Sequence, residues 1–145
     1  TAHGLLSPLI TECLPLAHCR HVSLRYRSNR CVLRVNVSGV QRMLRNLINN
    51  ALTYTPPGGS VLIGCRRQGG ALWIWCMDTG VGMTQAQLSM SFDAFTQFDQ
   101  GAKSLRTLGL GLYSFQKIAQ QSGFKTRWHS TPGKGTMIGF AVPLA

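Results

Sequence analysis

LWIWCMDTGVG, residues 72–82, is an apolar run that ends in one carboxylate and two glycines. Residues 72–77 suit a single buried strand, with Asp78 at its end. Gly80 and Gly82 let the backbone turn and approach another group closely. A buried acceptor beside glycine backbone suits an exocyclic amine such as that of adenine. Asp-Gly sequences also end strands for turn chemistry alone, so this stretch by itself leaves both interpretations open.

The rest of the chain alternates helices and strands around this stretch. Proline and glycine clusters separate the elements, and the apolar residues recur with helical or strand spacing. This mixture predicts a layered α/β sandwich. The predicted elements are, in chain order, a helix over 5–18, strands over 21–27 and 31–36, a helix from Ser38 that stops before Pro56, strands over 60–67 and 71–78, an irregular stretch over 84–108, a helix over 109–122, and strands over 125–130 and 136–143.

The composition fits a single domain over residues 1–145. With 145 residues, 44% of them hydrophobic, the chain can bury a sizeable core. No apolar run approaches the roughly 18–20 residues that a membrane span needs. The first residues lack a basic region leading into an apolar stretch, so no signal peptide is expected. Because the chain does not begin with methionine, we expect a fragment of a larger protein.

The cysteines form no CxxC pair and lie mostly in apolar sequence. An odd number without metal-ligand spacing favours reduced core thiols and a cytoplasmic domain over a disulfide or a zinc site. The five are Cys13, Cys19, Cys31, Cys65 and Cys76.

The charge balance is strongly basic, with 15 Lys and Arg against four Asp and Glu and a formal net charge of +11. Such a chain favours anionic partners, whether nucleotide, nucleic acid or an acidic protein surface. Residues 21–27 alternate basic and apolar side chains, which predicts a strand with a solvated basic face. No nucleic-acid-binding motif accompanies the charge, so we expect no nucleic-acid partner.

Three polar residues fall together at one edge of the predicted helix after Ser38. Asn46, Asn50 and Thr53 lie beside the apolar arc when the helix is projected at about 100° per residue. Amide oxygens are neutral hard ligands that suit Mg²⁺ beside a triphosphate. Polar residues also border buried helix faces without any function. Three asparagines within five positions lower helix propensity, however, and this favours a functional interpretation.

LGLGL, residues 108–112, follows Lys103, Arg106 and Thr107. Glycines that open a helix let a phosphate lie against free backbone amides at the positive helix end. Nearby cations suit a lid that closes over phosphates. Glycines also occur in ordinary loops, so this motif is weak when it stands alone.

Taken in order, these motifs resemble the ATP-binding catalytic domain of sensor histidine kinases, over essentially the whole chain. That domain belongs to a wider family with gyrase, the heat-shock chaperone ATPases and the mismatch-repair ATPases. The resemblance implies a Bergerat-type α/β (α+β) two-layer sandwich, in which about three helices cover a mixed, mostly antiparallel sheet of about five strands. The matching motifs are an N box at 46–51, a G1 box at 78–82, an F box at 91–95, a G2 box at 109–112 and a final glycine-threonine motif at 133–136.

The resemblance implies Mg-ATP as ligand and assigns roles to residues. Asp78 would accept from the adenine amine, helped by Thr136 through water, and Tyr54 would pack near the purine. Asn50 would be the Mg²⁺ ligand. Phe92 and Phe95 would anchor the lid. The full set expected to bind ATP is Asn46, Asn50, Thr53, Tyr54, Asp78, Gly80, Gly82, Lys103, Arg106, Leu108, Gly109, Leu110, Gly111, Leu112 and Thr136.

Asn46 occupies the position of the catalytic base in the hydrolytic branches of the family, which carry a glutamate there. An amide cannot take a proton at neutral pH. The resemblance therefore favours a kinase that holds the γ-phosphate for transfer over an ATPase that hydrolyses it.

One residue and one short run depart from the kinase pattern. The pattern has Lys or Arg where this chain has Thr53, and a glycine-rich run where this chain has Arg106-Thr107-Leu108. His3 begins a sequence similar to the phosphoacceptor box, but its acidic position is Gly4. Only 43 residues separate His3 from Asn46, too few for a complete dimerisation and phosphoacceptor domain. We therefore expect His3 to have no phosphoacceptor role.

The expected partners are ATP or ADP, a histidine-bearing dimerisation domain of the parent kinase and an acidic receiver domain of a response regulator. We expect a monomer for the isolated domain and a homodimer for the full-length protein. The domain is expected in the cytoplasm, with the parent either free or anchored in the inner membrane. Two alternatives stay open, a degenerate domain that binds nucleotide or partners without catalysis and a hydrolytic ATPase.

Overall fold

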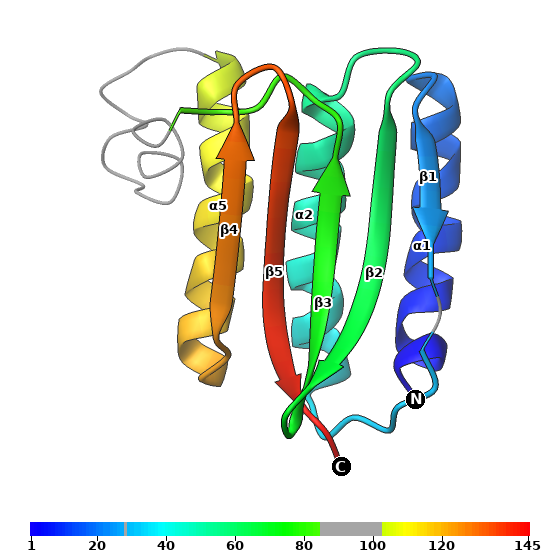
Figure 1. Cartoon of the computed structure of the whole chain (residues 1–145), viewed down its shortest axis with the longest axis vertical. Helices are drawn as coiled ribbons and strands as arrows, with labels where there is room; N and C mark the ends of the chain where they lie inside the picture. The colour runs from blue at the N-terminus through cyan, green and yellow to red at the C-terminus, as the bar shows by residue number, and fades with distance from the viewer. Residues whose placement is uncertain (28, 85–102) are drawn as a thin grey trace.

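The structure, a computed structural model, describes the backbone of residues 1–27, 29–84 and 103–145, and the side chains of all of these except 103–111. Its described helices and strands form two layers (Figure 1). The helices are α1 (Ala2–Cys19), α2 (Val37–Tyr54) and α5 (Lys103–Ser122). The strands are β1 (Ser23–Tyr26), β2 (Ser60–Gln68), β3 (Ala71–Asp78), β4 (Thr126–Thr131) and β5 (Gly135–Pro143).

The strands form one five-stranded sheet in the order β1-β2-β3-β5-β4. β1 pairs in parallel with β2, and the other three pairs are antiparallel. β3 is thus the central strand, so the apolar run over 72–77 and Asp78 lie in the middle of the sheet. The predicted sandwich of a mixed, mostly antiparallel sheet and three helices is confirmed.

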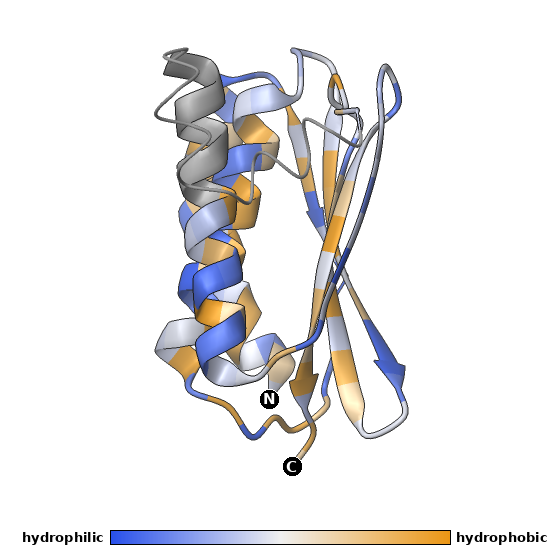
Figure 2. Ribbon diagram, turned by 90° about the vertical axis from the view of Figure 1, so that its left-hand side faces the viewer, coloured by the Kyte–Doolittle hydropathy of each residue, from blue (hydrophilic) through white to orange (hydrophobic). Residues whose placement is uncertain are grey.

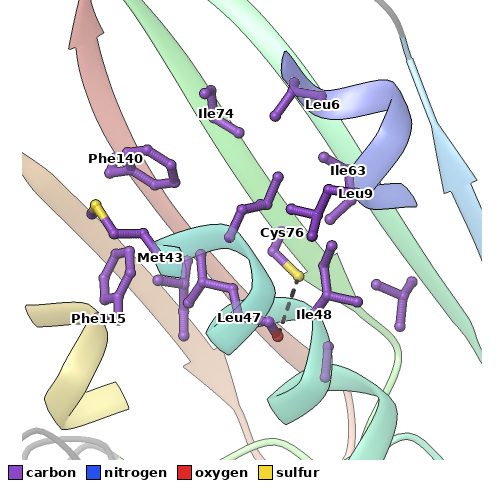
Figure 3. Close-up of a cluster of buried hydrophobic side chains, with 14 of the residues drawn as sticks. Leu6, Leu9, Met43, Leu47, Ile48, Ile63, Ile74, Cys76, Phe115 and Phe140 are labelled. Atoms are coloured by element: carbon purple, nitrogen blue, oxygen red, sulfur yellow. Dashed lines mark hydrogen bonds between the residues drawn. The ribbon is translucent and has the colours of Figure 1, made fainter. Parts of the chain in front are cut away.

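The three described helices cover one face of the sheet, with their apolar stripes turned toward it (Figure 2). α2 places its buried residues at helical spacing, from Val40 to Leu52. In the core, the Cys76 thiol of β3 donates to the Leu47 carbonyl oxygen of α2 at 3.7 Å (Figure 3). These contacts hold the end of α2 beside the end of β3, where the candidate site lies.

The ends of α2 follow local chemistry. Asn36 caps its start, since the side-chain oxygen accepts from the Gly39 backbone N–H at 3.2 Å. The helix ends at Tyr54, because Thr55 precedes Pro56 and adopts an extended conformation. The prediction from Ser38 to the residue before Pro56 is therefore correct to within two residues at each end.

The predicted strand over 31–36 is wrong. In that segment only Leu33 pairs, in an isolated bridge with Leu144. Leu33 is half-buried whereas Val32 is 58% exposed. The alternation therefore reflects a segment with one side against the core, and a period of two does not by itself supply a neighbouring strand.

The helix predicted over 109–122 begins earlier, at Lys103. Lys, Leu and Arg favour helix, and two glycines lower helix stability without ending the helix. α1 also begins earlier than predicted, at Ala2, because the Thr1 hydroxyl oxygen accepts from the Gly4 N–H at 3.1 Å. Most of the stretch predicted to be irregular, together with Phe92 and Phe95, lies outside the described residues.

All five cysteines are free thiols, as predicted. Cys13 and Cys76 are buried, whereas Cys19 is exposed, so the prediction of core positions does not hold for Cys19. Burial raises the pKa of the Cys76 thiol and raises that of Cys65 to about 11, so both are protonated at neutral pH. In the part of the chain that is described, no helix is both long and apolar enough to cross a bilayer.

Candidate functional site

Asp78 ends β3 with its carboxylate held in one orientation. Oδ1 accepts from the Gly80 backbone N–H at 2.8 Å and from the Thr136 backbone N–H at 3.2 Å. Both bonds are to Oδ1, and no described residue donates to Oδ2. Burial raises the pKa of Asp78, and the two amides act in the opposite direction. The carboxylate is therefore a partly desolvated acceptor with one oxygen available to a further donor.

The two glycines of the G1 stretch are required by space and conformation. A Cβ at Gly80 would lie 2.7 Å from the Tyr54 carbonyl oxygen and 2.8 Å from Asp78 Oδ1. Gly82 has φ +70°, and a Cβ there would overlap the Thr131 carbonyl oxygen. These close approaches bring the turn after β3 against both the end of α2 and the β4–β5 hairpin.

Ser130 joins three segments beside Asp78. Its hydroxyl oxygen accepts from the Met83 backbone N–H at 2.7 Å and lies 2.8 Å from Thr136 Oγ1. Ser130 also donates to the Gly135 carbonyl oxygen at 3.2 Å. With that proton used, the Thr136 hydroxyl is the donor of the shared bond and keeps lone pairs that can accept. Sequence reasoning missed Ser130, although the hairpin at 132–135 pairs it directly with Thr136.

The C-terminal half of α2 supplies the opposite wall. Asn50 and Tyr54 lie one turn apart and both line the pocket that Asp78 lines. Asn50 Oδ1 is buried and has no hydrogen-bond partner among the described residues. A buried, unpaired amide oxygen costs free energy unless a ligand satisfies it. Asn50 therefore fits the place of a cation ligand.

Asn46 and Thr53 do not line this pocket. Asn46 is half-buried one turn before Asn50. Thr53 is exposed, and its hydroxyl donates back to the Asn49 carbonyl oxygen at 2.7 Å. Thr53 lines a neighbouring hollow that shares Tyr54 and Val81 with the pocket.

The pocket brings together five residues predicted from the sequence, with Gly80 behind the carboxylate. It also contains Val81 and Met83, which the prediction missed although they alternate with the glycines of the same stretch. The residues that line it are Asn50, Tyr54, Asp78, Val81, Gly82, Met83 and Thr136.

The predicted lid residues cannot all be placed in the site. The side chains of Lys103, Arg106 and 108–111 lie outside the described residues. The backbone of Gly109 and Gly111 lies roughly two turns inside α5, so these residues do not open the helix as predicted. Leu112 is fully buried in the core.

Residues 16–145 match the family model of histidine kinase-, DNA gyrase B- and HSP90-like ATPases. The chain belongs to this family. No group of three or more His, Cys, Asp and Glu side chains that could hold a metal occurs in the described ranges of this ATPase domain. A cation here would depend on Asn50 together with oxygens of its ligand or of water.

Several sensor proteins are similar to this ATPase domain. Sensor protein GacS of Pseudomonas syringae pv. syringae is 30% identical over 148 residues, covering 97% of this chain and 16% of that protein. Sensor protein SrrB of Staphylococcus aureus strain MRSA252 is 32% identical over 126 residues, 84% of this chain and 22% of that protein. The Non-motile and phage-resistance protein of Caulobacter vibrioides is 33% identical over 110 residues, 72% of this chain and 13% of that protein. The chain thus spans less than a quarter of each of these relatives.

Solved structures show the same fold. Full-length ShkA in complex with AMPPNP superposes with a TM-score of 0.84 at 24% identity, over 100% of this chain and 30% of that chain. The nucleotide-free catalytic domain of histidine kinase ThkA superposes with a TM-score of 0.79 at 17% identity, over 97% of this chain and 90% of that chain. This chain therefore has the fold of the histidine kinase catalytic domain.

Proposed function

We propose that this chain is the ATP-binding catalytic domain of a sensor histidine kinase. It would bind Mg-ATP and donate the γ-phosphate to a histidine on a separate dimerisation domain. One observation carries the proposal: an oriented carboxylate and an unpaired amide oxygen line the same pocket, Asp78 on the sheet and Asn50 on α2.

The adenine would lie at the sheet end of the pocket. Asp78 Oδ2 would accept from the exocyclic amine, because Oδ1 is already bonded to two backbone amides. Thr136, whose hydroxyl oxygen keeps lone pairs, would accept from a water that also contacts the base. Tyr54 would pack along the purine from α2.

The phosphates would lie toward Asn50. Its unpaired Oδ1 would hold Mg²⁺, which supplies neutralising charge to the phosphate oxygens when bound. The strongly basic chain also favours an anionic ligand, and Lys103 and Arg106 remain candidates for lid cations.

Asn46 would distinguish transfer from hydrolysis. It lies one turn before Asn50 and carries no group that can accept a proton from water at neutral pH. Phosphoryl transfer depends mainly on positioning and charge neutralisation, which need no such base. The domain would therefore retain the γ-phosphate until an acceptor histidine arrives.

The test combines a binding and a transfer measurement. Mg-ADP is titrated into the chain by calorimetry, and γ-labelled ATP is then supplied with and without the histidine-bearing dimerisation domain of the same parent protein. We expect Mg-ADP binding, slow phosphate release by the chain alone, and acid-labile label on the dimerisation domain. Failure to bind at millimolar Mg-ADP would support a degenerate domain, and rapid phosphate release without acceptor would support a hydrolytic ATPase.

The remaining parts of the proposal concern the whole protein. The isolated chain would be a cytoplasmic monomer and the parent a homodimer, free or anchored in the inner membrane. The phosphorylated histidine would pass its phosphate to the acidic receiver domain of a response regulator. Sedimentation of the chain and of the full-length protein distinguishes the two oligomeric states.

A further inference from the structure

One face of the sheet is covered by none of the described helices, and the central strand makes that face apolar. Leu72, Ile74 and Cys76 of β3 are buried toward the helices. The alternate residues, Trp73, Trp75 and Met77, therefore point to the opposite side. Figure 1 shows the strands in front of the helices, so the viewer faces this side. The open face of an antiparallel sheet is ordinarily polar, and here it is not.

Strand register extends this apolar set onto the neighbouring strands. Each outward residue of β3 lies between one residue of β2 and one of β5. The three rows are Leu62–Met77–Met137, Gly64–Trp75–Gly139 and Arg66–Trp73–Ala141. We name the apolar side chains of these rows the outer patch, which comprises Leu62, Trp73, Trp75, Met77, Met137 and Ala141.

Basic residues surround the outer patch. Arg66 belongs to its last row, and Arg25 is paired with Leu62 from β1. Arg127 and His129 of β4 are paired with Gly139 and Met137. All four side chains are exposed. The basic border is thus formed by Arg25, Arg66, Arg127 and His129.

Acidic residues do not balance this border in the part of the chain that is described. Glu12 lies on α1 in an ion pair with Arg45 at 2.8 Å, and Asp78 lies in the pocket. The other two acidic residues of the sequence, Asp93 and Asp99, lie outside the described ranges. The outer patch therefore presents positive charge around an apolar centre.

Arg127 is held in place on this face. Its guanidinium carbon lies 4.7 Å from the centroid of the Trp73 ring, and Trp73 in turn stacks on Trp75 at 5.6 Å. A stacked guanidinium keeps the N–H groups along its edge available for a carboxylate. Because its position is fixed before binding, less side-chain entropy is lost when a carboxylate pairs with it.

We propose that the outer patch and its basic border dock an acidic protein domain with apolar residues at the centre of its contact surface. The charge of the border selects an acidic partner, and the partly exposed Trp75, Met77 and Met137 supply apolar anchors. This inference does not depend on nucleotide binding, because the outer patch shares no residue with the pocket.

Three other occupants fit less well. A second copy would oppose two basic borders, which repel. Stacking of nucleobases needs exposed rings, but Trp73 is only 5% exposed beneath Arg127 and beside Trp75. Insertion into a bilayer needs protruding apolar groups, whereas the Trp75 ring lies flat over Gly139, so closely that a Cβ there would overlap it.

The first experiment identifies the molecule that binds the outer patch in cells. The full-length parent carries the photoreactive amino acid p-benzoylphenylalanine in place of Met137, which is 36% exposed on the outer patch. The matched control carries it in place of Leu14, which is 44% exposed on α1. We expect a cross-link from position 137, absent from position 14, to a protein segment rich in Asp and Glu. Cross-links only to RNA, lipid or a second copy, or none at all, would overturn the proposal.

The second experiment measures binding of the cross-linked domain, purified on its own, to the purified chain. Trp75→Ser and Arg66→Glu should each weaken binding about tenfold or more, since buried aromatic and arginine anchors dominate interfaces. Arg42→Glu makes the same charge change at an exposed position on α2 and should have little effect. Circular dichroism and thermal unfolding verify that each variant is folded. Equal affinity of Arg66→Glu and Arg42→Glu, or unchanged affinity of Trp75→Ser, would refute the docking surface.

Discussion

The two walls of the pocket differ in how far their polar atoms are bonded before any ligand arrives. On the sheet wall, backbone amides hold Asp78 Oδ1, and Ser130 fixes the hydroxyl of Thr136. On the helix wall, Asn50 Oδ1 is buried without a described partner. The sheet wall is thus organised in advance, whereas the helix wall carries a desolvated atom that a ligand can satisfy.

This difference separates recognition of a base from charge neutralisation at phosphates. A preorganised acceptor distinguishes ligands by their donors, because a mismatch leaves a buried group unpaired. A neutral amide oxygen selects only weakly among ligands but suits a hard cation. Substitutions on the two walls should therefore change different properties of binding.

Asp78→Asn should have the largest effect. The amide retains an oxygen that can accept from Gly80 and Thr136, so the fold should survive. The position of Oδ2 becomes an NH₂ group. This hydrogen-bond donor then faces the adenine amine, which is also a donor. We expect Mg-ADP affinity to fall about a hundredfold, consistent with loss of a hydrogen bond to a charged group. Calorimetric titration measures the loss, and thermal unfolding verifies the fold.

A comparison of bases shows whether the loss is specific. Inosine diphosphate has a carbonyl in place of the exocyclic amine. Wild-type protein should bind inosine diphosphate far more weakly than ADP. In Asp78→Asn, the difference in affinity between the two nucleotides should be smaller. An unchanged preference for ADP in the variant would contradict the role of Asp78 in base recognition.

Asn50→Ala should have the second-largest effect on Mg-ADP affinity. It should reduce the extent to which nucleotide binding depends on Mg²⁺. We expect Mg-ADP affinity to fall about tenfold, because Mg²⁺ then keeps only water and phosphate oxygens as ligands. Binding of ADP in the presence of EDTA should hardly change. Stability should be equal or slightly higher, since the substitution removes a buried polar atom that lacks a partner.

Asn49→Ala is the matched control for this prediction. Asn49 neighbours Asn50 on α2 but is exposed, so its side chain should contribute nothing to the cation. If both variants lose the same affinity, or if Asn50→Ala weakens binding equally in EDTA, Asn50 is not the cation ligand.

A change of pH should have a smaller effect than either substitution. Acidification should change the stability of the fold and the affinity for nucleotide in opposite directions. Burial raises the pKa of Asp78 above its ordinary value. The folded state therefore binds the proton more tightly than the unfolded state, and the contribution of Asp78 to stability increases as pH falls through the folded pKa. The protonated group no longer accepts at full strength, so nucleotide affinity should decrease over the same range.

Asp78→Asn lacks this titration and supplies the reference. The difference in unfolding free energy between the two proteins should shift in favour of wild type on acidification, while their difference in Mg-ADP affinity narrows. Thermal unfolding and titration at several pH values measure both. Parallel pH profiles for the two proteins would contradict the assignment.

The sheet wall could be predicted from the sequence largely because its signals are local. An apolar run, a carboxylate and two glycines determine β3, the following turn and the acceptor together. The pairing of Ser130 with Thr136 was missed, since it depends on the register of the β4–β5 hairpin, and the turn residues do not define that register alone.

The helix wall was predicted in part. Helical spacing predicted Asn50 at the edge of the apolar arc, because a period of 3.6 residues assigns each position to a face, and Asn50 does line the pocket. Tyr54, which also lines the pocket, was predicted from the family resemblance alone. Thr53, at the margin of the apolar arc, turned outward and bonds back to Asn49. The start of α5 was misplaced because glycines are weaker helix breakers inside a long helix than their turn chemistry indicates.

Thr53→Lys should have the smallest effect on Mg-ADP affinity. It tests whether the helix wall lacks a cation for the phosphates. Thr53 is exposed, so a lysine fits without disturbing the core. The substitution gives up the bond to the Asn49 carbonyl oxygen and adds a cation where the histidine kinase pattern has one. We expect Mg-ADP affinity to rise about two- to fivefold at low salt, the size of an exposed ion pair, and the gain to shrink as salt screens it. Thr53→Gln gives up the same bond without adding charge and should show no gain. If lysine and glutamine behave alike, cations from elsewhere in the chain already neutralise the phosphates, and the missing charge at position 53 does not limit binding.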